Sequence, residues 1–357
     1  MEQTKLTVEF TKQDLHRLIV PLVIEQLLAI TVGLCDSVMV SQVGEAAISA
    51  VSLVDTVNVL LVNAFSALAT GGAVIAGQYL GRREQAKAGH AGEQLLLFMT
   101  EVSLAVMVLF YLCKGFVFGQ VEPDVAAYAN TYYMIVEASI PFLAIYNAGA
   151  ALFRVMGNSK ISMWVSLGMN LVNVTGNAIL IFGLHRGVEG VAIPTTVSRM
   201  VAAAAMLILL RRKDLPMHVE RLSLRHDRYV VKNILRFGVP NGLESGMFQL
   251  GKILLLSTVS VLGTASVAAN AIGNTVTTFQ CVPGNALGLA MVTVVSRCMG
   301  AGSYTQARYY TKKLLARTYL YMAGTIALVL ALLPLILQLY SVSPEATDYA
   351  RTVIWMH

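Results

Sequence analysis

The chain has 357 residues, of which 56% are hydrophobic and only 13% are charged. This composition excludes a soluble globular protein, because too few polar side chains are available to cover a water-facing surface, and it indicates a protein of the lipid bilayer. The formal net charge is +6, but the basic residues are spread over several loops without interleaved aromatic residues, which argues against nucleic acid as a partner.

The apolar residues form a series of helix-length segments along the chain. A spanning helix needs roughly 20 predominantly apolar residues. Nine segments meet this requirement: 18–43, 50–80, 91–113, 128–153, 161–183, 190–210, 237–262, 266–296 and 314–337. A tenth opens near Ala346 and is cut off at His357. Residues 1–17 are polar and of mixed charge, so no cleavable signal is expected, and the sequence predicts an all-α, polytopic membrane protein.

The Lys and Arg residues concentrate in alternate loops. If the amino terminus is inside, most of the 26 fall on the inner side, including a dense group between 211 and 236, while the outer segments carry only Lys114, Arg186 and Arg351. Since Lys and Arg are retained on the cytoplasmic side, we expect a multi-pass protein of the cell membrane with a cytoplasmic amino terminus. The four cysteines have no paired spacing, so neither a disulfide framework nor a zinc site is expected.

The sequence also repeats itself at a fixed offset of 219 residues. The matched residues are Pro21, Glu25, Gly44, Ala46, Ala50, Thr56, Val57, Ala67, Leu68 and Gly81, which recur as Pro240, Glu244, Gly263, Ala265, Ala269, Thr275, Val276, Ala286, Leu287 and Gly300. Just beyond, Gln85-Ala86 matches Gln306-Ala307 at an offset of 221, which predicts a loop two residues longer in the second copy. Six spans separate the copies, so we expect two parallel lobes related by an axis along the membrane normal.

The repeat divides the chain into two lobes and a linker. We predict a six-helix amino-terminal lobe at 1–210, a basic cytoplasmic linker at 211–231, and a partial carboxy-terminal lobe of about three and a half helices at 232–357. In transporters built from repeats, substrate and coupling ions bind near the membrane midplane and the lobes move against each other. The duplication therefore favours transport by rocking of two lobes.

Ionisable residues inside the spans are candidate functional groups, because a charge at the bilayer centre costs about 2.5 to 3.5 kcal/mol on insertion scales. Asp36 lies in the first span, and Leu255 takes its place in the second copy, so the duplicated architecture does not require the carboxylate. A partly desolvated aspartate can exchange a proton or coordinate sodium, which makes Asp36 a candidate cation-coupling residue. The alternative is an aspartate that is merely solvated near the outer interface.

Asparagines on the fifth span extend this candidate site. Asn173 and Asn177 are spaced i, i+4, and Asn170 lies one further turn back on the same side. Their amide groups can offer oxygens to an ion or hydrogen bonds to a carboxylate, so Asn173 and Asn177 join Asp36. Hydrogen bonding between helices is the structural alternative.

Four further charged residues lie in the spans. Glu25 and Glu244 are equivalent across the repeat, each four residues after a proline. Their recurrence suggests a shared structural part, yet two glutamates about a central axis could both attract a cation, so both are weaker candidates for binding substrate or ion. Arg199 and Lys252 are expected to serve mainly as partners of a carboxylate or of helix-end carbonyls.

No enzyme motif accompanies these residues. The sequence has no HExxH, no GxSxG and no cluster with metal-ligand spacing, so we expect no catalytic residue, no metal site and no cofactor apart from a coupling ion. The segment from Gly246 to Lys252 has the glycine and lysine spacing of a phosphate loop, but Ile253 replaces the required Ser or Thr, and the segment lies in an apolar helix.

Short runs along the chain occur in an order that is typical of one family. They are Pro21 to Glu25, Asp36-Ser37-Val38-Met39-Val40 followed by Gly44, Gly77-Gln78-Tyr79-Leu80-Gly81, Arg154-Val155-Met156-Gly157-Asn158-Ser159-Lys160, Gly187-Val188-Glu189-Gly190-Val191-Ala192, Gly238-Val239-Pro240, Leu262-Gly263-Thr264-Ala265 and Met299-Gly300-Ala301-Gly302. Over nearly the whole chain they resemble the MATE family of multidrug and toxic-compound extrusion transporters. The resemblance implies twelve helices in two six-helix lobes. Because this chain stops inside the tenth helix, we expect it to be C-terminally truncated.

The resemblance also implies a function and a site. It implies export of organic, often cationic, compounds in exchange for H+ or Na+, with Asp36 similar to the first-helix aspartate that titrates or binds the ion. Asn173 matches the family directly, whereas the position of Asn177 is often aspartate, which leaves one charge fewer here. We expect a monomeric antiporter of small organic cations in the lipid bilayer. The alternatives are a flippase for a lipid-linked precursor, which would be expected to have a more basic cavity than Arg199 and Lys252 provide, and an inactive or non-transporting fragment.

Overall fold

The computed structural model describes residues 10–118, 123–219, 225–339 and 344–356, and all regular elements in these ranges are helices. In chain order they are α1 (Lys12–Ser41), α2 (Glu45–Gly81), α3 (Gln85–Phe118), α4 (Pro123–Glu137), α5 (Ile140–Val155), α6 (Ser159–Ala178), the π-helix η1 (Ile179–Gly183), α7 (Glu189–Leu210), α8 (Arg228–Ser260), α9 (Thr264–Gly300), α10 (Tyr304–Leu339) and α11 (Pro344–Met356). The all-α prediction is confirmed.

Most of the expected spans are present as long apolar helices. Within the described residues, seven are long and apolar enough to cross a membrane, and α4 and α5 form an eighth if the pair is one span, bent by 46°. The expected seventh span, 237–262, falls in α8, which is not among them. The polar residues Glu244, Gln249 and Lys252 interrupt the apolar sequence of this helix, so its expected role as a span stays a prediction.

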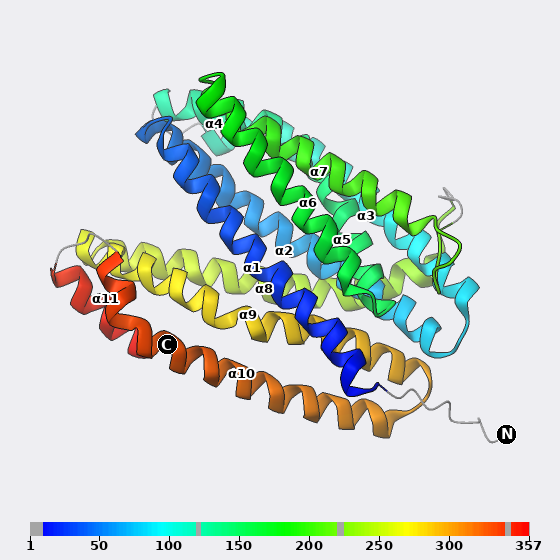
Figure 1. Ribbon diagram of the computed structural model, residues 1–357. Coiled ribbons are helices and arrows are strands. Elements are labelled where there is room, and N and C mark those ends of the chain that lie inside the picture. Colours follow the sequence, from blue (N-terminus) through cyan, green and yellow to red (C-terminus); the bar gives the residue numbers. More distant parts are fainter. Residues whose placement is uncertain (1–9, 119–122, 220–224, 340–343, 357) are drawn as a thin grey trace.

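The two copies of the repeat fold alike and run in parallel. Helices α2 and α9 each have 37 residues and each follow a glycine with positive φ, Gly44 at 132° and Gly263 at 99°. Pro21 lies inside α1 and Pro240 inside α8. Figure 1 shows the α2–α3 and α9–α10 turns at the end of the molecule where α1 begins, with the α1–α2 and α8–α9 turns at the opposite end. The prediction of two parallel, pseudo-symmetric lobes is confirmed.

The predicted difference in loop length between the copies is wrong. The α2–α3 connection consists of residues 82–84 and the α9–α10 connection of residues 301–303, so the two are equally long. Their second residues, Arg83 and Gly302, both have positive φ, at 63° and 71°. Because α10 already begins at Tyr304, Gln306 lies inside its first turn. The match of Gln85 with Gln306 implies two additional residues in the second copy, and these residues lie at the start of α10 and not in the loop.

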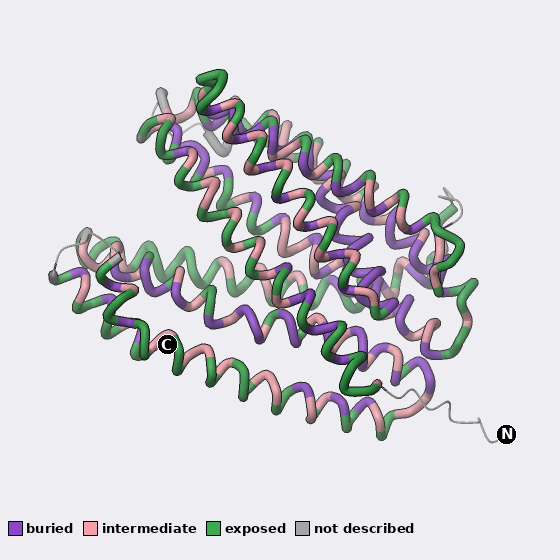
Figure 2. Tube along the Cα trace, viewed as in Figure 1, coloured by how far each residue is buried: buried purple, intermediate pink, exposed green. Residues whose placement is uncertain are grey.

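Close packing of helix backbones joins the lobes. An added Cβ at Gly81 would lie 2.1 Å from the carbonyl oxygen of Arg297, and one at Gly300 would lie 2.0 Å from the carbonyl oxygen of Gln78. These two contacts are equivalent under the repeat. Figure 2 shows buried residues running along the inner faces of the helices and exposed residues on the outside. These two glycines allow the backbones of α2 and α9 to approach closely, as small residues commonly do in membrane helix bundles.

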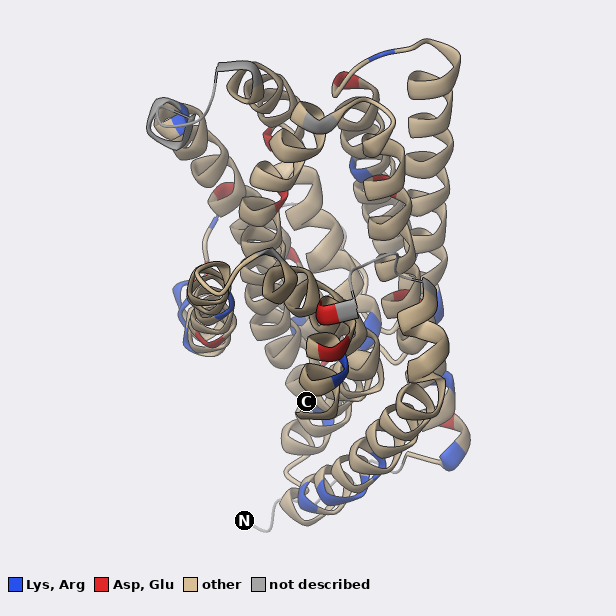
Figure 3. Cartoon of the chain, turned by 90° about the vertical axis from the view of Figure 1, so that its left-hand side faces the viewer, with Lys and Arg blue, Asp and Glu red and all other residues tan. Residues whose placement is uncertain are grey.

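The distribution of charge follows the helix ends. Most Lys and Arg residues lie in the lower half of the view in Figure 3, on the side where the chain begins, and several carboxylates lie among the helices in the upper half. This separation is the spatial counterpart of the alternating loop charge. The assignment of the basic side to the cytoplasm stays a prediction, as do the expected lobe boundaries at 1–210, 211–231 and 232–357.

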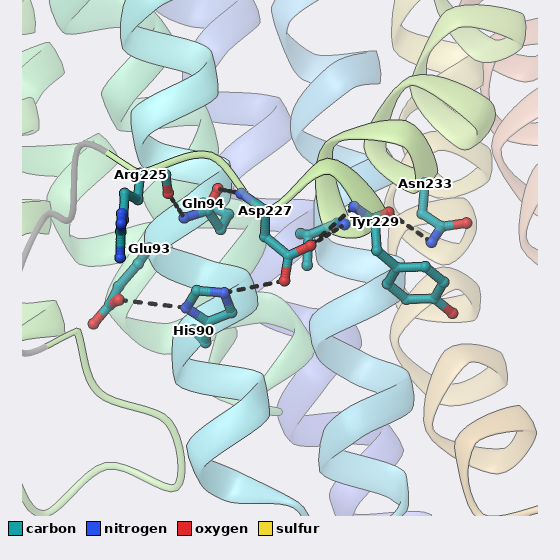
Figure 4. A network of polar contacts seen from close by, with 8 residues as sticks. His90, Glu93, Gln94, Arg225, Asp227, Tyr229 and Asn233 are labelled. Carbon is teal, nitrogen blue, oxygen red and sulfur yellow. Dashed lines mark hydrogen bonds and ion pairs between the residues drawn. The ribbon is translucent and has the colours of Figure 1, made fainter.

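The chain entering α8 is held against α3 by the side-chain amide of Gln94 (Figure 4). Gln94 Nε2 donates to the carbonyl oxygen of Arg225 at 2.8 Å, and its Oε1 accepts from the backbone N–H of Asp227 at 2.8 Å. Val230 and Ile234, in the first turns of α8, belong to the same buried cluster as residues of α2, α3, α5 and α7. The start of α8 is therefore packed with helices of the first lobe.

Asp227 caps α8 and also contacts α3. Its Oδ1 accepts from the backbone N–H groups of Tyr229 at 2.9 Å and Val230 at 3.3 Å, and its Oδ2 lies 3.3 Å from His90 Nε2. Partial burial acts to raise the pKa of the Asp227 carboxyl, but the two backbone N–H groups and His90 outweigh it, so this pKa lies below its usual value. The carboxylate form is the one that holds the cap.

Candidate functional site

A chain of polar side chains crosses the interior of the first lobe from α1 to α7. Asp36 Oδ1 on α1 accepts from Asn177 Nδ2 on α6 at 2.6 Å, and the same nitrogen lies 3.3 Å from Asn173 Oδ1. Asn173 Nδ2 donates to Thr195 Oγ1 on α7 at 3.0 Å, and Thr195 donates to the backbone carbonyl of Val191 at 2.8 Å. The structure thus brings together Asp36, Asn173 and Asn177, the three residues that we expected to form one site.

The sequence of α6 explains how the asparagines reach the interior. Its buried residues share a polar character and a spacing of three or four, and they are Ser159, Ser162, Ser166, Asn170, Asn173 and Asn177. Trp164 and Leu171, by contrast, are exposed. In a lipid environment the polar face of a helix turns toward the protein, so this periodicity orients α6. The π-helix η1 begins two residues after Asn177, and such irregular turns are frequent at functional sites.

The site has unused hydrogen-bonding capacity. Among the described residues, Asn177 Oδ1 and Asn170 Nδ2 are buried and have no hydrogen-bond partner. Asn177 is fully buried, whereas Asp36 is half-buried. The described part of the chain has no group of three His, Cys, Asp or Glu side chains able to hold a metal ion. The arrangement offers one carboxylate, amide oxygens and a hydroxyl, which can hold a proton or, after rotation of the amides, an oxygen-coordinated cation.

A second set of charged and polar groups lies beside this chain. Asp55 on α2 accepts from Tyr132 Oη on α4 at 3.3 Å, and Arg199 Nη1 on α7 donates to Ser139 Oγ at 2.8 Å. The Arg199 guanidinium is close enough to Asp36, to Asp55 and to Glu137 for electrostatic interaction with all three. Arg199 is therefore the shared countercharge of three carboxyl groups, in line with its expected role as an intramembrane partner.

Asp55, Glu137 and Thr195 were not among the residues expected to form the site. Asp55 lies in the predicted span 50–80 and Glu137 in the predicted span 128–153. The cost of an intramembrane carboxylate, which singled out Asp36, would have found both. Thr195 carries no comparable signal, because a hydroxyl in a span commonly bonds to its own helix backbone, and its contact with Asn173 depends on how α6 and α7 pack.

The two repeat-related glutamates lie elsewhere and differ from each other. Glu25 is buried and accepts hydrogen bonds from Ser162 Oγ on α6 and from Tyr146 Oη on α5, the latter at 3.4 Å. Glu244 is exposed on α8. Lys252 is also exposed, with its Nζ 5.1 Å from the centroid of the Phe248 ring. Neither glutamate is part of the hydrogen-bonded series that contains Asp36, Asn177 and Asn173. The two glutamates are equivalent in sequence, but their surroundings in the structure differ.

Two parallel lobes of long apolar helices, with polar groups enclosed within one lobe, define a polytopic membrane transporter. The chain matches the MatE family over residues 21–179 and 240–356. It belongs to this family of multidrug efflux transporters, and the resemblance inferred from the short sequence runs is confirmed.

Individual relatives agree with the family assignment. An uncharacterized transporter of Bacillus subtilis, YisQ, is 25% identical over 343 residues, with 94% of this chain and 75% of the relative covered. A probable multidrug resistance protein of the same organism, YoeA, is 24% identical over 347 residues, again with 94% and 75% covered. A solved MOP superfamily transporter from Pyrococcus furiosus superposes with a TM-score of 0.87 at 19% identity, over 97% of this chain and 80% of that one. The chain thus spans about three quarters of these relatives and shares the fold of the solved structure.

Proposed function

We propose that this protein is a secondary antiporter that exports organic cations in exchange for H+ or Na+, with Asp36, Asn173 and Asn177 as its cation-coupling site. The observation that carries the proposal is the contact between the Asp36 carboxylate and Asn177 inside the first lobe. An ionisable group kept within a membrane span is a functional group by default. Leu255 at the equivalent place in the second copy leaves this lobe as the ion-binding one.

The geometry favours a proton as the coupling ion. The neutral Asn177 side chain directs an N–H donor at Asp36 Oδ1. Of the three proposed site residues, Asp36 alone therefore offers the ion a negative charge. A proton requires a single oxygen, whereas a metal cation requires several oxygen ligands, and the amides of Asn173 and Asn177 would have to turn to supply them. Sodium is the alternative, and separate gradients distinguish the two.

An exposed stretch of α8 supports an organic cation as the substrate. Met247 and Phe248 are 72% and 68% exposed, and they lie three and four residues after the exposed Glu244 on the same helix. Flexible and aromatic side chains accommodate apolar molecules of different shape, and a carboxylate beside them attracts a positive charge. Glu244 is therefore proposed as a substrate residue. Glu25, with both carboxylate oxygens already accepting hydrogen bonds, fits a structural role better.

The proposed transport cycle couples the ion to the lobes through differential affinity. A cation that binds Asp36 more tightly in one lobe arrangement than in the other shifts the population toward the first. Organic substrate is then released on the outside, with the basic side of the molecule in the cytoplasm and the protein acting as a monomer in the cell membrane. The flippase alternative has less support, since Arg199 already interacts with Asp36, Asp55 and Glu137 and Lys252 is exposed on α8.

Efflux of a fluorescent cationic dye from vesicles containing the purified protein tests this proposal. Wild-type protein and Asp36→Asn are compared under a proton gradient alone and a sodium gradient alone. We expect Asp36→Asn to abolish gradient-driven efflux and the wild type to respond to the proton gradient. The matched control is Ser37→Ala, since the exposed Ser37 hydroxyl donates only to its own helix at the Gly33 carbonyl. Unchanged efflux in Asp36→Asn would refute the assignment.

A further inference from the structure

The segment predicted as the fourth span is divided into two helices, and polar side chains gather at the break between them. Helix α4 ends at Glu137 and α5 begins at Ile140, with a bend of 46° between them. Two side chains of α7 reach this point: Thr196 Oγ1 donates to the Ile135 carbonyl at 2.9 Å, and Arg199 Nη1 donates to Ser139 Oγ at 2.8 Å. Broken helices are tolerated in membranes where such groups satisfy the freed backbone, and in transporters they commonly form ion sites.

Glu137 is the unexplained group at this break. Its side chain is 0% exposed, and neither carboxyl oxygen has a hydrogen-bond partner among the described residues. The nearby tyrosines do not supply one, since Tyr111 Oη donates to the Met134 carbonyl and Tyr133 Oη donates to the Phe110 carbonyl, both at 2.9 Å. An ionised carboxylate buried without hydrogen bonds is strongly disfavoured. The structure therefore calls for a bound positive charge at Glu137.

Arg199 alone cannot provide that charge. It interacts electrostatically with Asp36, Asp55 and Glu137, and its Nη1 donates a hydrogen bond to Ser139 Oγ. Three carboxylates and one guanidinium leave two negative charges, which must be balanced within the lobe. Asp55 accepts a hydrogen bond from Tyr132, and Asp36 accepts one from Asn177, whereas neither carboxyl oxygen of Glu137 has a partner among the described residues. Glu137 is therefore the carboxyl group that most needs a further positive charge.

We propose that Glu137 is a second proton-binding carboxyl group of the first lobe, separate from the Asp36 site and linked to it through Arg199. A proton fits this site better than a metal ion, because it needs one oxygen and a metal ion needs several ligands. The carboxylate takes one proton from water and becomes a neutral acid, and it returns that proton to water when the break is hydrated in another arrangement of the lobes. No group is oxidised or reduced.

Protonation of Glu137 stands on the geometry of the break, whereas its exchange during transport rests on the proposed antiport function. When Glu137 is neutral, the Arg199 charge is balanced by Asp55 and Asp36 alone. Protonation of Glu137 therefore affects the Asp36 site through Arg199. Antiport would then move up to two protons for each cycle, one from each carboxyl group. The charged and titratable groups facing Glu137 are Arg199, Tyr111 and Tyr133.

Infrared spectroscopy of the purified full chain in lipid nanodiscs tests the proposal without a transport measurement. A protonated carboxyl group has a C=O stretching band that ionised carboxylates lack. We expect the wild type to show this band at neutral pH. The band of Glu137→Gln should be weaker by the part that Glu137 contributes, whereas the band of Asp36→Asn should still contain that part. Glu101→Gln is the matched control, since Glu101 is an exposed carboxylate 3.2 Å from His226. Its protonated-carboxyl band should be as strong as that of the wild type.

A Glu137→Gln spectrum that superimposes on the wild-type spectrum would overturn the proposal. If Glu137→Gln does not fold, Asp36→Asn decides the question alone, because the absence of any protonated-carboxyl band at neutral pH in that variant also overturns it. The outcome is distinct from that of the efflux experiment. Unchanged efflux in Asp36→Asn refutes the coupling site, but the Glu137 band would persist.

Discussion

The close backbone packing at Gly81 and Gly300 makes the junction of the two lobes sensitive to a single methyl group. An added Cβ at Gly300 would lie 2.0 Å from the carbonyl oxygen of Gln78, and one at Gly81 would lie 2.1 Å from the carbonyl oxygen of Arg297. Both obstacles are backbone atoms in the last turns of α2 and α9, so no side-chain rotation can relieve them. Gly300→Ala should therefore push α2 and α9 apart.

The size of the effect follows from the overlap. A Cβ at Gly300 would lie 2.0 Å from the Gln78 oxygen, and ordinary contact begins near 3.4 Å, so the helices must separate by about 1.4 Å to admit the methyl group. Overpacking of this kind costs about 1–3 kcal/mol, while replacement of glycine by alanine in a helix gains at most about 1 kcal/mol. We expect a net destabilisation of about 1–2 kcal/mol for Gly300→Ala, and a similar value for Gly81→Ala because the contact is symmetric.

Thermal unfolding of the purified variants in detergent measures this effect. Gly251→Ala is the matched control, since it lies inside α8 and an added Cβ there meets nothing within 4 Å. This control should keep or raise the unfolding temperature, whereas Gly81→Ala and Gly300→Ala should lower it. If either junction variant is as stable as Gly251→Ala, the lobes do not depend on this backbone contact and the reasoning fails.

Three further predictions concern charged groups. Asn177→Asp replaces the amide whose Nδ2 lies 2.6 Å from Asp36 Oδ1 with a second carboxylate, so the pair should hold a proton more tightly. The maximum of dye efflux should then move to higher pH, and an unmoved maximum contradicts this. Asp227→Ala removes a helix cap and should cost about 1 kcal/mol at pH 7. Since the pKa of Asp227 is lowered in the folded protein, its contribution to stability is present above the unfolded pKa of about 3.9 and disappears as the pH falls through the folded pKa, which denaturation at several pH values would test. Arg199→Met leaves three carboxyl groups without their shared cation and should cost roughly 3 kcal/mol, whereas Lys252→Met on the exposed face of α8 should unfold like the wild type.

Much of the candidate site was accessible from sequence because the membrane makes charge conspicuous. Asp36 stood out as a carboxylate in an apolar segment, and the i, i+4 spacing of Asn173 and Asn177 placed both on one face of a helix. Applying the same criterion to every span would also have found Asp55 and Glu137. What no spacing could reveal is that Arg199 interacts with all three carboxyl groups, since Arg199 and the three carboxyl groups come from four different helices.

The repeat illustrates the limit of equivalence in sequence. Glu25 and Glu244 occupy matched positions, yet the former is enclosed by α5 and α6 and the latter is exposed on α8. The helices that surround each copy differ, and side-chain environment depends on those neighbours. The loops that follow Gly81 and Gly300 show the opposite case. They have the same length in both copies, although the match of Gln85 with Gln306 predicted a longer loop in the second copy.

The sequence by itself determined the all-helical membrane fold, the parallel orientation of the two lobes and the family. These follow from local properties, namely the length of apolar segments, the alternation of loop charge and the fixed offset of the repeat. Only the tertiary structure decided which polar groups meet, that Glu137 has no hydrogen-bond partner among the described residues where α4 and α5 meet, and that Gly81 and Gly300 approach the backbones of Arg297 and Gln78 reciprocally. Those features depend on distances between helices remote in the chain, which hydropathy and spacing along one helix do not contain.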